Sequence, residues 1–185
     1  LEAGLKEAVK FDRSRTFAPL RRFCPTYRVS SLDSIDPNVL WDMSYRAILL
    51  DVDNTLIPWK GMKFPDTTMD WIAKCREVGL KLCIVSNTRN KPRLKLLSEK
   101  LGIPHAEGPM KPGRAAFVDA MRITGVPPEA TIMVGDQLFT DVWGANRLGI
   151  ASIWVTPMAK REFFGTKFSR LAERMITRLL KRHAE

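Results

Sequence analysis

Two aspartates, Asp51 and Asp53, stand two positions apart at the end of residues 47–52, an apolar run typical of a buried strand. Carboxylates this close repel one another when burial removes water, so a cation is expected to compensate their charge. Acidic residues also fill turns or cap helices without any chemical role. The rest of the chain decides between these interpretations.

Further polar groups stand at the borders of other predicted elements. Ser86 and Asn87 end a second apolar run, Lys111 precedes a helical segment, and Asp136 ends a third run with Asp141 five residues later. Carboxylates can hold Mg²⁺, a hydroxyl and an amide can bind phosphoryl oxygens, a lysine can neutralise negative charge, and an unligated carboxylate can attack phosphorus. Each group alone is a weak signal, but this ordered set predicts phosphoryl transfer.

Alternating strand and helix patterns place these groups. Strands are predicted at 47–52, 80–85, 131–134 and 150–155, with a short extended piece at 103–106, and helices at 67–78, 90–101, 113–123 and 140–148. This alternation is typical of βαβ units and predicts an α/β fold with a doubly wound, mostly parallel sheet. Ligand sites in such sheets lie at the carboxyl ends of the strands, where the polar groups fall.

Charge divides the chain into three predicted parts: an N-terminal arm (1–46), a catalytic domain (47–157) and a C-terminal segment (158–185). The net charge of +10 is uneven, because the first part carries +2, the second +3 and the third +5. Such an excess indicates a polyanionic partner, namely nucleic acid, an anionic membrane or a phosphorylated substrate. Three cysteines without CxxC spacing favour neither a disulfide framework nor a zinc site.

The ordered motifs resemble those of the haloacid dehalogenase (HAD) superfamily of aspartate-dependent phosphatases, over about residues 46–157. The resemblance implies that Asp51 is the nucleophile and forms an aspartyl-phosphate. It implies that Asp53 protonates the leaving group and later deprotonates water. Lys111 would neutralise the phosphoryl group and the resting Asp51. The second aspartate of the pair favours phosphate ester hydrolysis over dehalogenase or phosphonate chemistry.

The same resemblance assigns the binding residues. Ser86 and Asn87, together with Thr55, would bind the transferred phosphoryl group. Asp51, the backbone carbonyl of Asp53, and Asp136 would bind Mg²⁺, and Asp141 would orient the metal shell and Lys111. A finer resemblance, to the YqeG-like branch that includes phosphatidylglycerophosphate phosphatases, rests on residues 134–141 and 23–35. Thr88 is a departure, since many relatives have a second Asn there.

No large cap domain is expected, because only 32 residues separate Asp53 from Ser86 and 23 separate Asn87 from Lys111. A small flap, residues 58–65 with Trp59, is all that remains near the entrance. By the resemblance, capless members act on large substrates such as proteins, nucleic acid ends or lipid headgroups. The leading prediction is therefore Mg²⁺-dependent hydrolysis of phosphatidylglycerophosphate at the membrane surface.

Two alternatives stay open. One is a soluble capless phosphatase acting on phosphoproteins, nucleotides or nucleic acid ends. The other, disfavoured because no basic patch interleaved with aromatic residues lies on the sheet, is a nucleic-acid-binding module without catalysis.

The ends of the chain bear on the membrane prediction. From Phe164 the C-terminal segment predicts a basic amphipathic helix, with apolar residues on one face and arginines at every fourth position on another. Such a helix suits an anionic membrane surface, and it equally suits packing on the domain. Phe17, Leu20 and Phe23, with Arg21 and Arg22 between them, could add a second membrane contact or form an arm that covers the core. The predicted location is cytoplasmic, peripheral on the inner face of the membrane.

Overall fold

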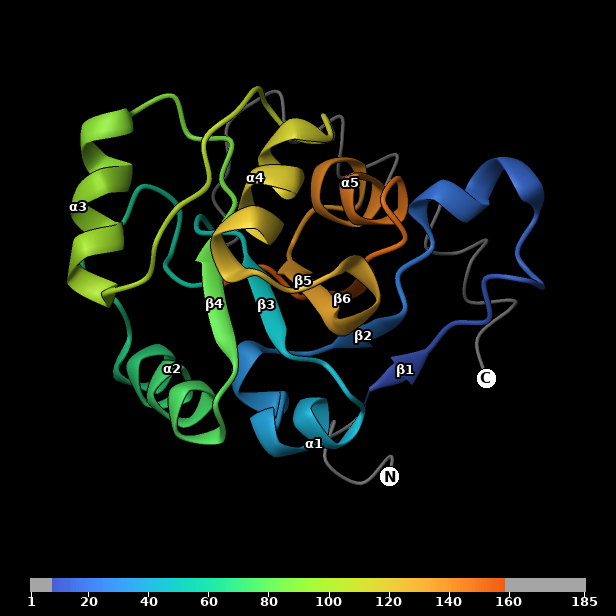
Figure 1. The fold of residues 1–185 in the computed structure, drawn as a ribbon, viewed down its shortest axis with the longest axis horizontal. Helices are drawn as coiled ribbons and strands as arrows, with labels where there is room; N and C mark the ends of the chain where they lie inside the picture. Colours follow the sequence, from blue (N-terminus) through green and yellow to red (C-terminus); the bar gives the residue numbers. More distant parts are fainter. Residues whose placement is uncertain (1–7, 159–185) are drawn as a thin grey trace.

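A six-stranded β-sheet forms the centre of the protein in a computed structural model, which describes residues 8–158 (Figure 1). Its strands run in the order β1-β2-β6-β5-β3-β4, and every neighbouring pair is parallel except β1 and β2. The strands are β1 (Val9–Lys10), β2 (Tyr27–Val29), β3 (Ala47–Leu50), β4 (Lys81–Ile84), β5 (Thr131–Gly135) and β6 (Ala151–Val155). The predicted α/β class with a mostly parallel sheet is confirmed.

Helices connect the parallel strands. They are α1 (Pro37–Asp42), α2 (Asp66–Val78), α3 (Lys91–Leu101), α4 (Ala115–Thr124) and α5 (Trp143–Asn146). Of these, α2 and α3 end at the residues predicted from the sequence. Gly79, Gly102 and Gly125 each follow a helix in the left-handed conformation, which glycine adopts without steric cost. These glycines stop α2, α3 and α4, and return the chain toward the next strand.

Both faces of the sheet are covered, as a doubly wound sheet requires. On one face, buried side chains of α1, α2 and α3 pack against alternate strand residues such as Ile48, Leu50 and Val134. On the other face, α4 and α5 pack against Leu49 and Met133. Strand residues are buried on both sides, which explains why β3 and β5 are apolar along their length rather than alternating.

The N-terminal part of the chain joins the same sheet. It contains η2 (Ala18–Phe23), η3 (Leu32–Ser34) and α1, as well as β1 and β2. Strand β2 pairs in parallel with β6, so that Tyr27 lies opposite Ile153 and Val29 opposite Val155. Neither β2 nor α1 was among the elements predicted from the hydrophobic pattern, because each is only three to six residues long.

The C-terminal half of the domain departs from prediction in one place. Residues 140–148 were predicted as one helix, but a π-helical turn, η5 (Leu138–Val142), precedes a short α5, and η4 (Pro128–Ala130) leads into β5. Single π turns within helical segments are frequent at functional sites. The basic helix predicted in 158–185 lies outside the described residues.

The segments between the motifs contain little besides the sheet's own connections. Residues 54–85 form a loop with the flap, then α2 and β4, whereas residues 88–110 form α3 and an extended piece beside β4. Among residues 8–158, no helix has the length and apolar character needed to cross a membrane.

Candidate active site

Parallel strands bring the predicted site residues to one edge of the sheet. Leu50 at the end of β3 lies opposite Ile84 of β4 and Val134 of β5. Asp51 follows directly and donates its backbone N–H to Val134 O at 3.0 Å. Since β3 and β4 point upward in Figure 1, this carboxyl edge is the upper edge of the sheet in that view.

Lys111 is the centre of a buried ion-pair network. Its ammonium nitrogen lies 2.6 Å from Asp51 Oδ1, 2.7 Å from Asp141 Oδ1 and 2.6 Å from Val85 O. All three side chains are nearly inaccessible to solvent. Removing such groups from water costs several kcal/mol per ion, so an arrangement of this kind stays folded only when each charge is paired.

The charges of this network act on one another. Burial raises the pKa of the Asp51 carboxyl, and the Lys111 ammonium opposes that rise. For Lys111, burial alone would lower the pKa, but the carboxylates of Asp141 and Asp51 outweigh it and raise the pKa above its usual range. The lysine is therefore a fixed positive charge beside Asp51.

The π turn η5 orients Asp141. Asp141 Oδ2 accepts a hydrogen bond from the Gln137 backbone N–H at 3.0 Å, while Asp141 Oδ1 forms the ion pair with the Lys111 ammonium. The carboxyl group rests against the Cα of Gly135, where any side chain would overlap it. Asp136 is fully buried, and its backbone carbonyl accepts a hydrogen bond from Trp154 Nε1.

Three carboxylates gather closely enough to hold a metal ion. Asp51, Asp136 and Asp141 each offer an oxygen atom, and these atoms lie within 4.8 Å of one another. Asp51 Oδ2 is buried and lacks a hydrogen-bond partner within residues 8–158, so a ligand for it is expected. Hard oxygen donors of this kind, with the Lys111 ammonium beside two of the three carboxylates, fit Mg²⁺.

Among the four predicted aspartates, Asp53 is the one whose side chain lies outside this cluster. Its carboxylate forms a bidentate pair with Arg93 of α3, with distances of 3.0 Å from Nη1 to Oδ2 and 2.9 Å from Nη2 to Oδ1. The Lys60 backbone N–H also donates to Oδ1 at 2.9 Å. Sequence reasoning missed Arg93, which lies 40 positions after Asp53.

The predicted phosphate-binding residues occupy the rim of the same edge. Asn87 uses its side-chain amide to hold the backbone of Lys111, accepting from its N–H at 2.6 Å and donating to its carbonyl at 3.1 Å. The half-buried Ser86 hydroxyl accepts from the Thr88 N–H at 3.2 Å. The Thr55 hydroxyl is buried and has no hydrogen-bond partner within the described range. Asn87 therefore positions Lys111, and phosphate binding by these residues stays a prediction.

Gly135→Ala is expected to impair catalysis more than folding. The new Cβ would overlap the Asp141 carboxyl and push it away from Lys111. Because displacements of about 1 Å in a catalytic site cost about 100-fold in rate, kcat should fall by 10- to 100-fold. The test is kcat for hydrolysis of a phosphate ester in the steady state, divided by the folded fraction that circular dichroism measures.

Gly144→Ala is the matched control, because it places a Cβ 2.5 Å from the Phe117 ring rather than beside a carboxylate. It should lower the free energy of unfolding by about 1–3 kcal/mol, as overpacking does, and leave kcat of the folded protein unchanged. Equal losses of kcat in both variants would show that Gly135 has no special relation to the site.

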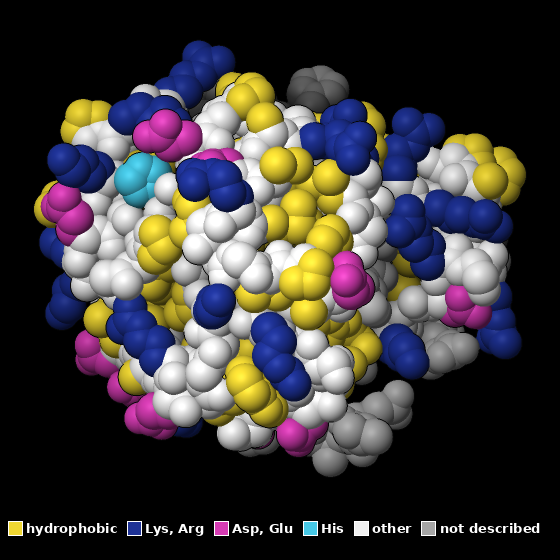
Figure 2. Space-filling view, in the orientation of Figure 1, with side chains coloured by type: hydrophobic (Ala, Val, Ile, Leu, Met, Phe, Trp, Pro, Cys, Tyr) yellow, Lys and Arg dark blue, Asp and Glu magenta, His cyan; other side chains and the backbone are white. Residues whose placement is uncertain are grey.

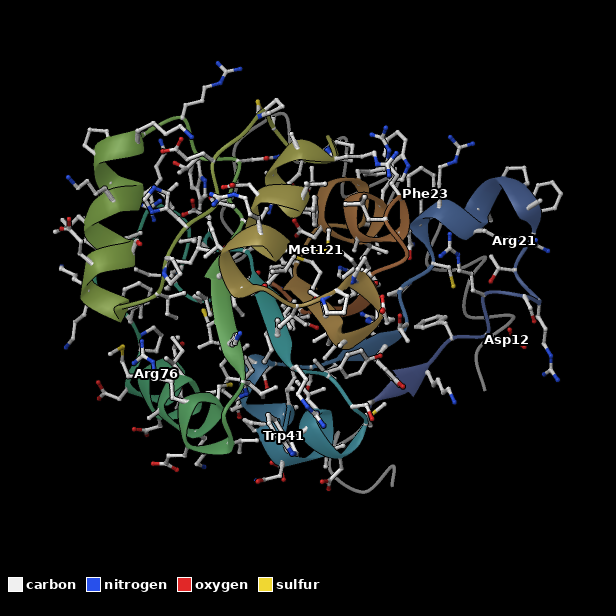
Figure 3. The ribbon with its side chains drawn as sticks, in the orientation of Figure 1. Asp12, Arg21, Phe23, Trp41, Arg76 and Met121 are labelled. Carbon is white, nitrogen blue, oxygen red and sulfur yellow. The ribbon has the colours of Figure 1, made fainter. Side chains whose placement is uncertain are left out.

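The N-terminal arm contacts the segment that carries Asp136 and Asp141. The Phe23 ring packs edge-on against Phe139 and Trp143, with centroid distances of 5.0 and 5.5 Å. Figure 3 places Phe23 beside the η5–α5 segment, with Arg21 farther out on η2. Asn146 also donates to the backbone carbonyls of Arg22 and Cys24. The arm is therefore anchored directly next to the carboxylate cluster.

Comparison with known proteins adds sequence and fold relationships. A family model described as mitochondrial PGP phosphatase matches residues 7–159. The probable phosphatase YqeG of Bacillus subtilis (strain 168) is 39% identical over 160 residues, covering 86% of this chain and 92% of that protein. The mitochondrial phosphatidylglycerophosphatase GEP4 of Saccharomyces cerevisiae is 32% identical over 126 residues, covering 60% and 67%.

A solved structure shares the fold. The putative HAD-hydrolase YfnB from Bacillus subtilis, bound to magnesium, superposes with a TM-score of 0.52 at 18% identity, covering 65% of this chain and 91% of that one. At this identity the likeness concerns the arrangement of the sheet and helices. The family match, in contrast, extends over every residue of the site described above.

Proposed function

The chain belongs to the mitochondrial PGP phosphatase family of HAD-type phosphatases, and we propose that it hydrolyses the phosphate monoester of phosphatidylglycerophosphate at a membrane surface with Mg²⁺. The observation that carries the chemistry is the buried Asp51–Lys111–Asp141 network, in which one oxygen of Asp51 has no hydrogen bond from any residue of 8–158. A relative that is a phosphatidylglycerophosphatase supports the substrate.

In the proposed reaction Asp51 attacks phosphorus and forms an aspartyl-phosphate, which splits one displacement into two easier steps. Lys111 holds Asp51 in place and neutralises charge on the phosphoryl oxygens. Asp53 donates a proton to the leaving alkoxide and later takes one from water. Mg²⁺, held by Asp51, Asp136 and the Asp53 carbonyl, would supply charge neutralisation for the phosphoryl group.

The entrance of the site favours a substrate that brings its own bulk. Apolar side chains are exposed around the carboxyl edge: Met62 in the flap, Met110 beside Lys111, and Met158, whose N–H donates to Asn54 O. A groove of about 360 Å³ lies alongside, lined by Thr55, Pro58 and residues 155–158 among others. An apolar rim around a polar site suits a lipid whose headgroup enters and whose chains stay outside.

The arm supplies a surface for the bilayer. Phe17, with an exposed fraction of 67%, stands on it next to the exposed Arg21 and Arg22. Figure 2 shows Lys and Arg side chains gathered at the end of the molecule that η2 forms. Exposed aromatic and basic side chains together favour an anionic membrane, through insertion of the ring and attraction of the charges.

The experiment that tests the function is release of inorganic phosphate from phosphatidylglycerophosphate in vesicles, with Mg²⁺ and with EDTA. Phosphopeptides, nucleotides and 3′-phosphorylated oligonucleotides are assayed beside it. Preferential Mg²⁺-dependent release from the lipid supports the proposal. Faster hydrolysis of a soluble phosphoester would sink it in favour of a soluble phosphatase.

Replacing Phe17, Arg21 and Arg22 together by Ala is expected to weaken binding to anionic vesicles. Basic residues near an anionic surface contribute about 1 kcal/mol each, so the two arginines alone account for a loss of about 30-fold in partitioning. Lys95→Ala is the control, since Lys95 is exposed on α3 at the opposite side of the molecule in Figure 1. Co-sedimentation with anionic and neutral vesicles measures the effect, and equal binding of all three proteins would refute this role of the arm.

A further inference from the structure

Arg93 joins the acid–base candidate to the flap. Besides its bidentate pair with Asp53, its guanidinium donates to Gly61 O, from Nη2 at 2.9 Å and from Nε at 3.3 Å. The exposed fractions of the two charged side chains are only 9% for Arg93 and 22% for Asp53. A charge-assisted, forked contact of this kind is among the stronger side-chain interactions in proteins.

This contact engages both oxygens of the Asp53 carboxylate. Both carboxylate oxygens accept hydrogen bonds from Arg93, and Oδ1 also accepts from the Lys60 N–H. A group that transfers a proton must come within hydrogen-bond reach of the atom that it serves. Release of Asp53 from part of the Arg93 fork would free a carboxylate oxygen to turn toward a leaving-group oxygen.

A second anion can make that exchange favourable. Guanidinium binds phosphate oxygens with the same forked geometry as a carboxylate, so a phosphodiester can replace Asp53 on Arg93. Phosphatidylglycerophosphate carries such a phosphodiester one glycerol unit away from the monoester that is hydrolysed. A simple monoester such as glycerol 3-phosphate has no second anion with which to displace the carboxylate.

We propose that Arg93 determines specificity, an inference that rests on the function proposed above. In the free protein Arg93 holds Asp53 back from proton transfer, and it releases Asp53 when the phosphodiester of a two-phosphate substrate binds Arg93. Arg93 is a positioning residue for Asp53 and a binding residue for the second phosphate. The flap is also held by Lys100, which donates to Met62 O at 3.2 Å and, in the described part of the chain, makes no hydrogen bond or ion pair with Asp53. Anchoring of the flap and control of Asp53 can therefore be separated by mutation.

The test compares two water-soluble substrates, the deacylated headgroup of phosphatidylglycerophosphate and glycerol 3-phosphate, so that no membrane is involved. Wild type should prefer the two-phosphate compound in kcat/KM. Arg93→Met should lower kcat/KM for that compound by about 10- to 100-fold, the range for hydrogen bonds between charged groups, mainly by raising KM, because the second phosphate loses its partner while Asp53 is no longer held back. For glycerol 3-phosphate kcat/KM should stay within about threefold or rise, because only the second phosphate uses Arg93.

Two further variants exclude a merely structural effect. Arg93→Lys keeps the charge without the forked geometry and should retain part of the preference. Lys100→Met should leave kcat/KM unchanged for both substrates. The inference is overturned when wild type shows no preference or no hydrolysis of either compound. It is also overturned when Arg93→Met keeps the preference for the two-phosphate compound, or lowers kcat/KM equally for both substrates. The same holds when Lys100→Met reproduces the effect of Arg93→Met. Preference for the headgroup without hydrolysis of the intact lipid would remove the lipid proposal and leave the inference standing.

Discussion

Asp51→Asn is expected to reduce phosphate release by about 10⁴-fold or more, because the amide cannot attack phosphorus and loss of a nucleophile is among the most severe catalytic lesions. The fold should persist. Asn has nearly the same shape, and Lys111 keeps its contacts with Asp141 Oδ1 at 2.7 Å and Val85 O at 2.6 Å. The measurement is steady-state phosphate release together with the midpoint of thermal unfolding.

Asp53→Asn is the matched comparison for this variant. It changes the second aspartate of the same motif, for which we propose proton transfer, and such groups contribute about 10²–10⁴-fold. Activity should therefore fall less than in Asp51→Asn. Wild-type hydrolysis by purified, folded Asp51→Asn would refute the nucleophile assignment.

Lys111→Met is expected to damage both stability and catalysis. Methionine fills a similar volume, but it leaves the buried carboxylates of Asp51 and Asp141 without the cation that lies within 2.7 Å of each. Breaking a buried ion pair from one side costs about 3–5 kcal/mol, so urea unfolding in EDTA should show a loss of that size. Loss of charge stabilisation for the phosphoryl group should lower kcat by about 10²–10³-fold.

Magnesium provides a second measurement on Lys111→Met. A ligand that binds the folded state raises the unfolding midpoint, and the ion should gain affinity where a competing ammonium has been removed. Mg²⁺ should therefore stabilise Lys111→Met more than wild type. Unchanged stability of the variant in EDTA would contradict the account of Lys111 as the charge that balances the carboxylates.

Much of this site could be predicted because it depends on strand ends. Apolar runs fixed where β3, β4 and β5 lie, and parallel pairing necessarily brings the residues that follow them to one edge. Glycines after α2 and α3 marked the ends of those helices. Asp51 and Asp141 accordingly both lie within hydrogen-bond distance of Lys111, although they are 90 positions apart.

Other features depend on side-chain orientation and on short elements, for which the sequence holds little signal. The Asp53–Arg93 pair is set by the turn at Asn54, whose φ of 65° lies in the left-handed region, and by the fold of the flap. The position of Asn87 after a strand predicts that it lies near the phosphate site. It does not predict that the side-chain amide binds the backbone of Lys111. Strand β2 spans three residues and gains its structure from pairing with β6.

The most direct test of the central claim is to identify the residue that carries the phosphoryl group during turnover. Wild type is mixed with phosphatidylglycerophosphate vesicles and Mg²⁺, quenched in acid within the first turnovers, reduced with borohydride and analysed by peptide mass spectrometry. The account predicts reduction of an acyl phosphate at Asp51 to homoserine, absent in Asp51→Asn and without substrate. Phosphate release with no modification at Asp51, or with the modification at another residue, would contradict it.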